Sequence, residues 1–543
     1  MADNVPITPG AGVNIAADEI LGVKYPRSKM TLGRDGVNAG DIHDYNPIPM
    51  HLLQSESAFG DLKTVSPIEQ VSANFTYEVN PEEFYKFTFG TGSITNSNSR
   101  AVLSTGGTAN SIAAVVSRRT TNYRPGLGST ARFTAGFDTS VTGDASTSAG
   151  LGTEENALMF VYKNSTMNIL HRRGGQRDAR LLDITTGSSS AGTVALTLDD
   201  DLINISVTDN GGNTAETATE IVTELNTTHA VALLIAGYQA FAYGNHVTLI
   251  ALRTGLKSGT FSVGYGATGI VGPLSQLAVG ATATETLIPQ SSWNKDKANG
   301  TDYLPNIDWS LGNVFQIKYQ WLGFGLMTFA MEDPNTSQFV KLHDIHYAGT
   351  SAIPNIENAN MPLIWVAGNG ATTDDISMYG SSGAAYLEGG TSYSNFQNKK
   401  SAFNSDTIGT TETPLISFCM PDFYENKTNE SLAEFFRLAL SSSGAGQFAI
   451  YKGTSANPLY LEGNTSWQSV TPNTMVVYDT ASTGWTGGLL QSVFRADGTV
   501  NLTATAEEID LFNILPGEMV LVTAQADSGS IKFAGTFTWA ENK

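Results

Sequence analysis

Residues 308–348, DWSLGNVFQIKYQWLGFGLMTFAMEDPNTSQFVKLHDIHYA, decide the fold class of this chain. Polar and apolar side chains alternate through residues 314–321, which is the pattern of a strand with one buried face. LGFG at 322–325 and DPNT at 333–336 are turn sequences, and a further run of strand-forming residues follows each of them. The stretch therefore predicts a three-strand antiparallel meander.

The composition extends this prediction to the whole chain. Only 15% of the 543 residues are charged and 55 are glycine, which is typical of many short strands joined by polar turns. The chain is too long for one ordinary domain, so we expect roughly three globular units. The predicted fold class is mainly β, with several antiparallel, jelly-roll-like β-sandwiches, a small inserted domain and an extended N-terminal arm.

The N-terminal arm is predicted over residues 1–65. Prolines and glycines interrupt this segment, so its isolated apolar residues cannot close a core alone. Val13, Ile15 and Tyr25 are nevertheless more apolar than a solvated tail requires. We interpret them as contacts with a neighbouring subunit or with the body of the chain, and a disordered terminus is the alternative.

Three further units are predicted from changes in the turn and strand pattern. They are a β-sandwich split between residues 66–181 and 286–411, an inserted α+β domain at 182–285, and a C-terminal β-sandwich at 412–543, in which residues 432–440 are assigned to a strand. The insert has the order ββαββ. Its helix is predicted to begin after Asn213, capped together with Glu216, and its buried face comprises Ala218, Ile221, Val222 and Leu225.

Charge and cysteine content restrict the partners. Lys and Arg total 30 against 51 acidic residues, a net charge of −21, so the surface repels a nucleic-acid backbone and no nucleic acid is expected as a partner. The single cysteine, Cys419, fits assembly in a reducing cytoplasm. The N-terminus lacks the pattern of a secretory signal, and the apolar runs are far shorter than the ~20 residues that cross a bilayer, so no membrane insertion is expected.

The sequence holds few patterns typical of catalytic or metal-binding sites. His343 and His346 flank Asp344, but on a strand the two histidines face opposite sides of the sheet. The run at residues 199–201, DDD, offers carboxylates for calcium, yet the glycine and glutamate of a calcium loop do not follow, and a hairpin turn is the simpler interpretation. We expect neither an enzyme nor a cofactor nor a bound metal.

Two groups of residues are candidate contact sites. The first is a cluster of arginines in an acidic chain: Arg172, Arg173, Arg177 and Arg180. Guanidinium groups bind carboxylates bidentately, so the cluster is predicted either to join copies of the chain or to pair within it, and both explanations remain open. The second is a set of aromatic residues in a glycine-rich loop predicted at 368–411, whose exposed rings suit contact with a glycan: Tyr379, Tyr386, Tyr393 and Phe396.

Several motifs occur in a recognisable order along the chain. YRPG at 123–126 precedes a strand, LMFVYKNSTMNILHRRGG at 158–175 forms a hairpin, and YQWLGFG and EDPNTSQFVKLHDIHYA belong to the meander. The start, ADNVPITPGAGVNIAADEILGVKYPRSKMTLGRDGVNAGD, and the end, LPGEMVLVTA with a final FTWAE, complete the pattern. In this order the chain resembles a family of tailed-bacteriophage virion proteins.

The resemblance implies a non-enzymatic structural protein of the virion, synthesised in the host cytoplasm. Its expected position is the tail, baseplate or fibre, and its expected partners are other copies of itself, as a homo-oligomer, and other virion proteins. Two alternatives remain: a receptor-binding protein that recognises a host surface glycan during host attachment, and a capsid decoration or head-fibre protein.

Overall fold

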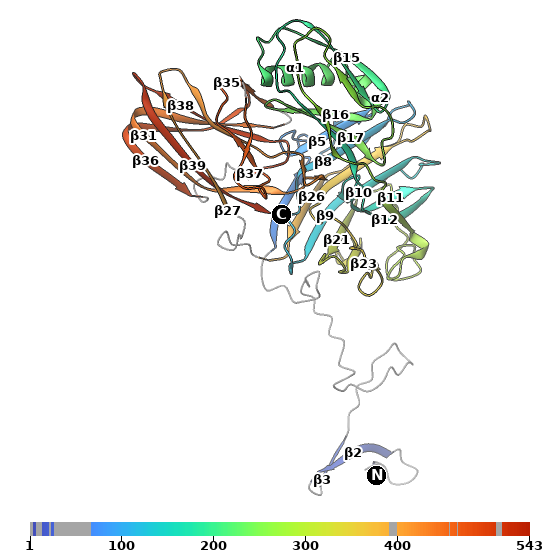
Figure 1. The fold of residues 1–543 in the computed structure, drawn as a ribbon. Coiled ribbons are helices and arrows are strands. Elements are labelled where there is room, and N and C mark those ends of the chain that lie inside the picture. The colour runs from blue at the N-terminus through green and yellow to red at the C-terminus, as the bar shows by residue number, and fades with distance from the viewer. Residues whose placement is uncertain are drawn as a thin grey trace. The chain divides into compact units, whose positions relative to one another are not determined.

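Most of the chain after residue 66, together with three strands near the N-terminus, is described by the computed structural model (Figure 1). The described residues are 4–6, 14–20, 23–26, 67–389, 399–454, 457–463, 465–505 and 513–542. The chain forms two compact units, Met1–Glu56 and Ser57–Lys543, and each is described by itself.

The N-terminal unit contains a small antiparallel sheet within the predicted arm. Its strands, in the order β1-β2-β3, are β1 (Asn4–Pro6), β2 (Asn14–Ile20) and β3 (Val23–Pro26). The predicted contact residues Ile15 and Tyr25 lie on β2 and β3, of which only the backbone is described, and Val13 lies outside the described residues. The arm is therefore not extended throughout, because it pairs locally with itself.

Two antiparallel sheets form the first β-sandwich of the larger unit. The seven-stranded sheet has the order β20 (Thr284–Pro289), β12 (Thr166–Arg173), β11 (Ala157–Lys163), β10 (Ser146–Gly152), β24 (Pro362–Gly368), β8 (Ile112–Thr120) and β5 (Phe84–Phe89). The six-stranded sheet has the order β23 (Phe339–Ile345), β22 (Met327–Glu332), β21 (Asn313–Tyr319), β9 (Ser129–Ala135), β26 (Ser382–Leu387) and β4 (Ile68–Asn74). A smaller sheet, β25 (Ser377–Gly380), β7 (Ala101–Ser104) and β6 (Ser93–Asn96), accompanies them, and the 3-10 helix η1 (Gln290–Ser292) follows β20.

Aromatic side chains fill the space between the two large sheets. The ring centroids of Phe160 on β11 and Phe315 on β21 are 4.6 Å apart, and Phe160 also meets Phe329 on β22 edge to face at 5.5 Å. Trp365 on β24 contacts Phe133 on β9, and its ring nitrogen donates to the carbonyl of Thr134 at 3.0 Å. Burial of these rings is the main stabilising term of a sandwich core. The predicted meander is confirmed as β21, β22 and β23, and the predicted hairpin as β11 and β12.

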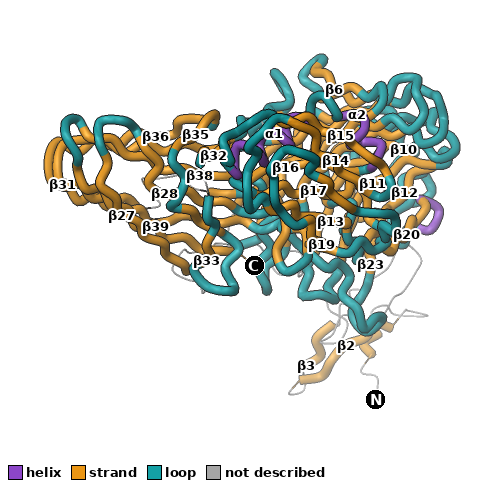
Figure 2. The backbone as a smooth tube through the Cα atoms, turned by 45° about the horizontal axis from the view of Figure 1, so that its top comes forward, coloured by secondary structure: helices purple, strands orange, loops and turns teal. Residues whose placement is uncertain are grey.

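The insert is an α+β domain with its own core. One sheet has the order β16 (Tyr238–Tyr243), β17 (His246–Thr254), β13 (Arg177–Asp183) and β19 (Leu274–Ala278), and the other β15 (Asp201–Val207), β14 (Gly192–Leu198) and β18 (Ser262–Gly264). The helices α1 (Thr214–Asn226) and α2 (Ala230–Ala236), purple in Figure 2, pack on this domain. The predicted cap is confirmed, since the side chain of Asn213 accepts from the backbone amides of Ala215 and Glu216.

The limits and order of the insert differ from the prediction. Gln176 and Ala281 exchange two backbone hydrogen bonds that close the base of the domain, so the insert runs from about 176 to 281 rather than from 182 to 285. β20 pairs with β12 and belongs to the sandwich. The predicted ββαββ order is also incomplete, because the described insert has seven strands, β13 to β19, and a second helix, α2. An apolar run as short as residues 230–236 does not distinguish a helix from a strand.

The C-terminal β-sandwich is organised around one long strand, β31 (Leu432–Gly453), which confirms the strand predicted at 432–440. Its first half pairs with β39 (Ile531–Asn542) and its second half with β38 (Met519–Ala526), while β36 (Leu489–Thr505) pairs along most of its length. The change of partner falls at SSSGAG, residues 441–446, whose small side chains permit a strand to bend from one sheet to the other. Phe418 packs against Phe537 between these layers, with ring centroids 5.0 Å apart.

The remaining strands extend this sandwich. They are β27 (Lys399–Ile408), β28 (Thr413–Cys419), β33 (Gln468–Ser469), β34 (Val477–Asp479) and β37 (Asn513–Ile514) in the main sheet, and the pairs β29 (Phe423–Tyr424) with β30 (Lys427–Thr428) and β32 (Leu459–Glu462) with β35 (Gly484–Gly487). Because β27 pairs with β39, the C-terminal unit includes residues 399–408, and the boundary predicted at 411/412 is wrong. No helix in the described part of the chain is long and apolar enough to cross a membrane.

Candidate functional site: the arginine junction and an open groove

One arginine of the predicted cluster, Arg177, lies where the two sandwiches and the insert meet. Arg177, the first residue of β13, places its Nε 3.4 Å from Oε1 of Glu155 in the β10–β11 turn. Its Nη2 lies 3.4 Å from the hydroxyl of Thr428 on β30, and that hydroxyl donates to the same Glu155 oxygen at 2.5 Å. One residue from each of the three parts thus joins a single hydrogen-bonded group, which we call the arginine junction.

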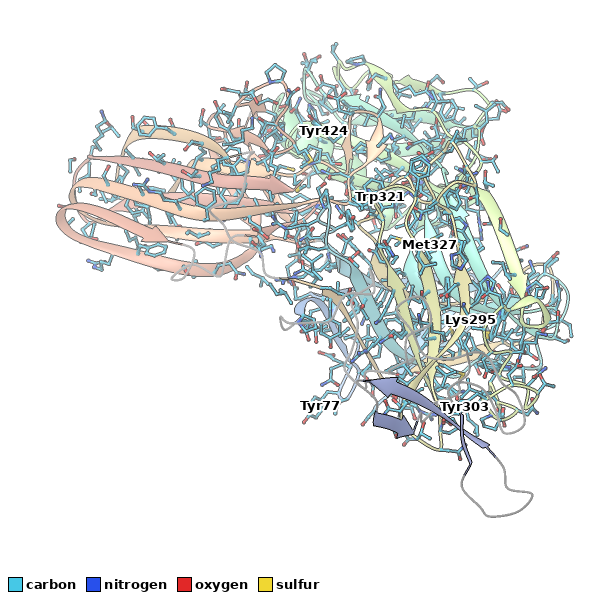
Figure 3. The ribbon with its side chains drawn as sticks, turned by 90° about the horizontal axis from the view of Figure 1, so that it is seen from below. Tyr77, Lys295, Tyr303, Trp321, Met327 and Tyr424 are labelled. Carbon is cyan, nitrogen blue, oxygen red and sulfur yellow. The ribbon has the colours of Figure 1, made fainter. Side chains whose placement is uncertain are left out.

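The β29–β30 hairpin holds this junction together from the C-terminal side. Phe423 packs with Ala179 and Ile250 of the insert, and the neighbouring Tyr424 is labelled in Figure 3. The hydroxyl of Tyr243 on β16 donates to Oδ2 of Asp422 at 2.7 Å. The hairpin therefore contacts both the insert, through Phe423 and Asp422, and the first sandwich, through Thr428.

Acidic groups outnumber the cation at the junction. Burial raises the pKa of Asp422 to about 6, and the hydrogen bond from Tyr243 and the charge of Arg177 oppose that rise. Burial, and then the charge of Glu155, raise the pKa of Glu430 to about 8. A guanidinium group among these carboxyl groups cannot neutralise all of them, so protonation is the remaining way to relieve their repulsion.

The other predicted arginines also meet partners within the chain. Arg172 pairs with Glu285 at 2.6 Å, and Arg180 forms two hydrogen bonds with Asp178, at 2.9 and 3.0 Å. The guanidinium of Arg173 lies 6.0 Å from the ring centroid of Tyr347. Pairing within the chain, one of the two explanations left open by the sequence, therefore accounts for Arg172, Arg177 and Arg180, while their role between copies of the chain stays a prediction.

The acidic partners of these arginines were not predicted. Glu155 is 22 residues from Arg177, and Thr428 is 251 residues from it. Only Asp178, two positions from Arg180, had a local signal, because residues at i and i+2 of a strand share a face. The junction is a product of tertiary packing.

The predicted aromatic loop is wrong for the residues that the structure describes. Tyr379 lies on β25 and Tyr386 on β26, both in paired strands, and Tyr393 and Phe396 lie outside the described residues. The hydroxyl of Tyr379 donates to the carbonyl of Ser310 at 3.1 Å. The guanidinium of Arg100 lies over the Tyr379 ring, 4.3 Å from the ring centroid. Tyr379 is thus a structural residue.

Tyr386 borders an open groove of about 700 Å³ on the outer face of the six-stranded sheet. The floor is formed by small side chains of β4 and β26, and the lining also includes Arg132 of β9 and the turn between β6 and β7 with Arg100. Tyr77, labelled in Figure 3, is 91% exposed just after β4. At this groove a predicted glycan-contact residue, Tyr386, meets a hollow surface.

The remaining chemical candidates have partners in the protein. His343 is buried, which lowers its pKa, and its Nδ1 lies 3.1 Å from the backbone amide of Asn294. Asp199 pairs with Lys257 at 3.0 Å, and Asp199 and Asp200 form the turn between β14 and β15, as predicted for a hairpin. Over the described ranges no three histidine, cysteine or acidic side chains are arranged to hold a metal ion.

The comparisons with known proteins give no family. No family model matches the sequence, and no curated protein matches it. Among solved structures, a chain from the structure titled "Life in the extremes: atomic structure of Sulfolobus Turreted Icosahedral Virus" aligns with 6% identity over 90% of this chain and 98% of that chain. The TM-score of 0.14 is too low to carry an argument about fold or function.

Proposed function

We propose that this protein is a non-enzymatic structural component of a tailed-phage virion, associated with the tail, baseplate or fibre, and that its N-terminal arm joins it to other copies or to other virion proteins. The observation that carries the proposal is the separation of residues Met1–Glu56 from the body as a compact unit of their own. Among the described strands, β1, β2 and β3 pair only with one another.

A sheet of this size needs a further surface for its stability. Its strands have 3, 7 and 4 residues. Sheets of a few short strands are independently stable only when an apolar face packs against something else. A protein partner supplies that surface in an assembly, and a segment that becomes ordered on a partner is a common way for subunits to be linked.

Deletion of residues 1–56 tests the proposal. The truncated body keeps all the sheets of the larger unit, so we expect its thermal unfolding to stay within a few degrees of that of the full chain. We expect it to be missing from purified particles when it competes with tagged full-length protein during infection, measured by mass spectrometry. Equal incorporation of both proteins would overturn the proposed role of the arm.

A substitution pair tests the sheet rather than the length of the arm. Ala16 lies on the central strand β2, opposite Asn4 of β1. Proline removes the amide and is not tolerated in a central strand, so we expect Ala16→Pro to reduce incorporation, whereas Ala16→Val should not. Immunogold labelling of particles then separates a tail, baseplate or fibre position from the alternative of a capsid decoration or head-fibre protein.

A further inference from the structure

Small side chains on neighbouring strands of the six-stranded sheet form the floor of the groove beside Tyr386. Ser382 on β26 lies opposite Asn74 on β4, and Ala384 lies opposite Ser72. On the other side of β26, Ala384 lies opposite Arg132 of β9. Because these residues point away from the core and only Arg132 is large, the sheet surface is hollow here, with a volume of about 700 Å³.

Polar and aromatic groups form the rim of this groove. Tyr386 lies opposite Glu69 at the edge of the sheet. Asn98 and Ser99 form the tight turn between β6 and β7, with positive φ angles of 53° and 58° that asparagine tolerates well. Hydroxyl, amide and carboxylate groups thus line the rim of the hollow.

Two arginines give the groove a positive character in an otherwise acidic chain. The guanidinium of Arg100 rests on the ring of Tyr379, 4.3 Å from its centroid, and its Nε is buried without a hydrogen-bond partner among the described residues. Arg132 lies 5.1 Å from the ring centroid of Phe339. Aromatic faces hold both side chains in place before a ligand arrives, and the side-chain oxygen of Gln316 also accepts from Nε and Nη2 of Arg132 at 2.8 and 3.2 Å. This ordering reduces the entropy lost on binding. Glu69 is the only acidic residue of the lining.

We propose that this groove binds an oligosaccharide that carries carboxylate groups. Sugar hydroxyls match the hydroxyl and amide groups of the rim, the ring of Tyr386 offers an apolar face for a pyranose, and guanidinium groups bind carboxylates through paired hydrogen bonds. The groove lies on the body of the protein, so this activity is independent of the assembly role of the arm.

Calorimetric titration of the full-length protein tests the proposal with matched ligands. A short oligogalacturonate supplies the carboxylates, its methyl ester supplies the same sugars without charge, and hexaglutamate supplies charge without sugars. We expect the oligogalacturonate to bind and the other two ligands to bind at least about tenfold more weakly. Equal binding of hexaglutamate, equal binding of the ester, or no binding of the oligogalacturonate would each overturn the proposal.

Variants then locate the site. Arg132→Gln and Arg100→Gln should each weaken binding at least about tenfold, whereas Arg119→Gln, at an exposed arginine outside the groove lining, should not change it. Ala384→Trp fills the floor from the solvent side and should abolish binding even where an arginine variant is unstable. If Ala384→Trp, confirmed as folded by its circular dichroism, binds as the wild type does, the ligand lies elsewhere and the assignment is wrong.

Discussion

Replacement of Glu430 by glutamine should stabilise the protein at alkaline pH and leave its stability unchanged at acid pH. Burial and the charge of Glu155 raise the pKa of Glu430 from 4.5 to about 8. The folded state therefore holds this proton more tightly than the unfolded chain does. The stability that the protonated group contributes is complete below pH 4.5 and is lost as the pH rises to about 8. Glutamine has the same shape and stays neutral at every pH.

The size of the effect follows from these two pKa values. At ~1.36 kcal/mol for each pH unit, their difference corresponds to about 5 kcal/mol. Glu430 is only partly buried as a residue, and water screens its charge, so we expect about half of this, or about 2.5 kcal/mol, in favour of Glu430→Gln above about pH 8. For a domain of the size of the C-terminal sandwich, this corresponds to a rise of about 5–10 °C in Tm.

Differential scanning calorimetry of the full-length protein at about pH 5, 7 and 9 measures this difference. Glu425→Gln, at an exposed position in the turn between β29 and β30, is the matched control and should follow the wild type at each pH. If Glu430→Gln and the wild type differ in Tm by the same amount at all three pH values, Glu430 ionises as it does in the unfolded chain. The account of an acid-rich junction would then be refuted.

Two further predictions concern the insert. Asn213→Ala should destabilise this domain by about 1 kcal/mol, because the Asn213 side chain caps two backbone amides of α1. Asn213→Asp should retain most of the stability, since aspartate is also a good N-cap residue. Urea unfolding of the insert compares the two variants. A fragment of residues 176–281 should fold alone, because its two ends pair through Gln176 and Ala281 and it has a hydrophobic core of its own. A non-cooperative thermal transition of the fragment would contradict this.

Local patterns in the sequence determined many of the strands and the main helix, but not α2 or the strands β25, β26 and β27 in the segment predicted as a loop. Alternation and turn residues gave the meander β21–β23 and the hairpin of β11 and β12, because side-chain period and turn chemistry depend only on neighbouring residues. The start of α1 was predictable for the same reason, since Asn213 acts on amides two and three residues ahead. The mainly β, multidomain fold class follows from these elements and from the composition.

Tertiary structure alone decided which strands became neighbours and therefore where the sites lie. β27 follows the first sandwich in sequence but pairs with β39, more than a hundred residues later, and this moved the domain boundary. The groove exists because β26 lies between β9 and β4, and the junction because Thr428 and Glu155 reach Arg177 from different domains. The free energy gained by burying whole sheet faces selects which distant strands pair. That free energy comes from residues too far apart in sequence to leave a local pattern.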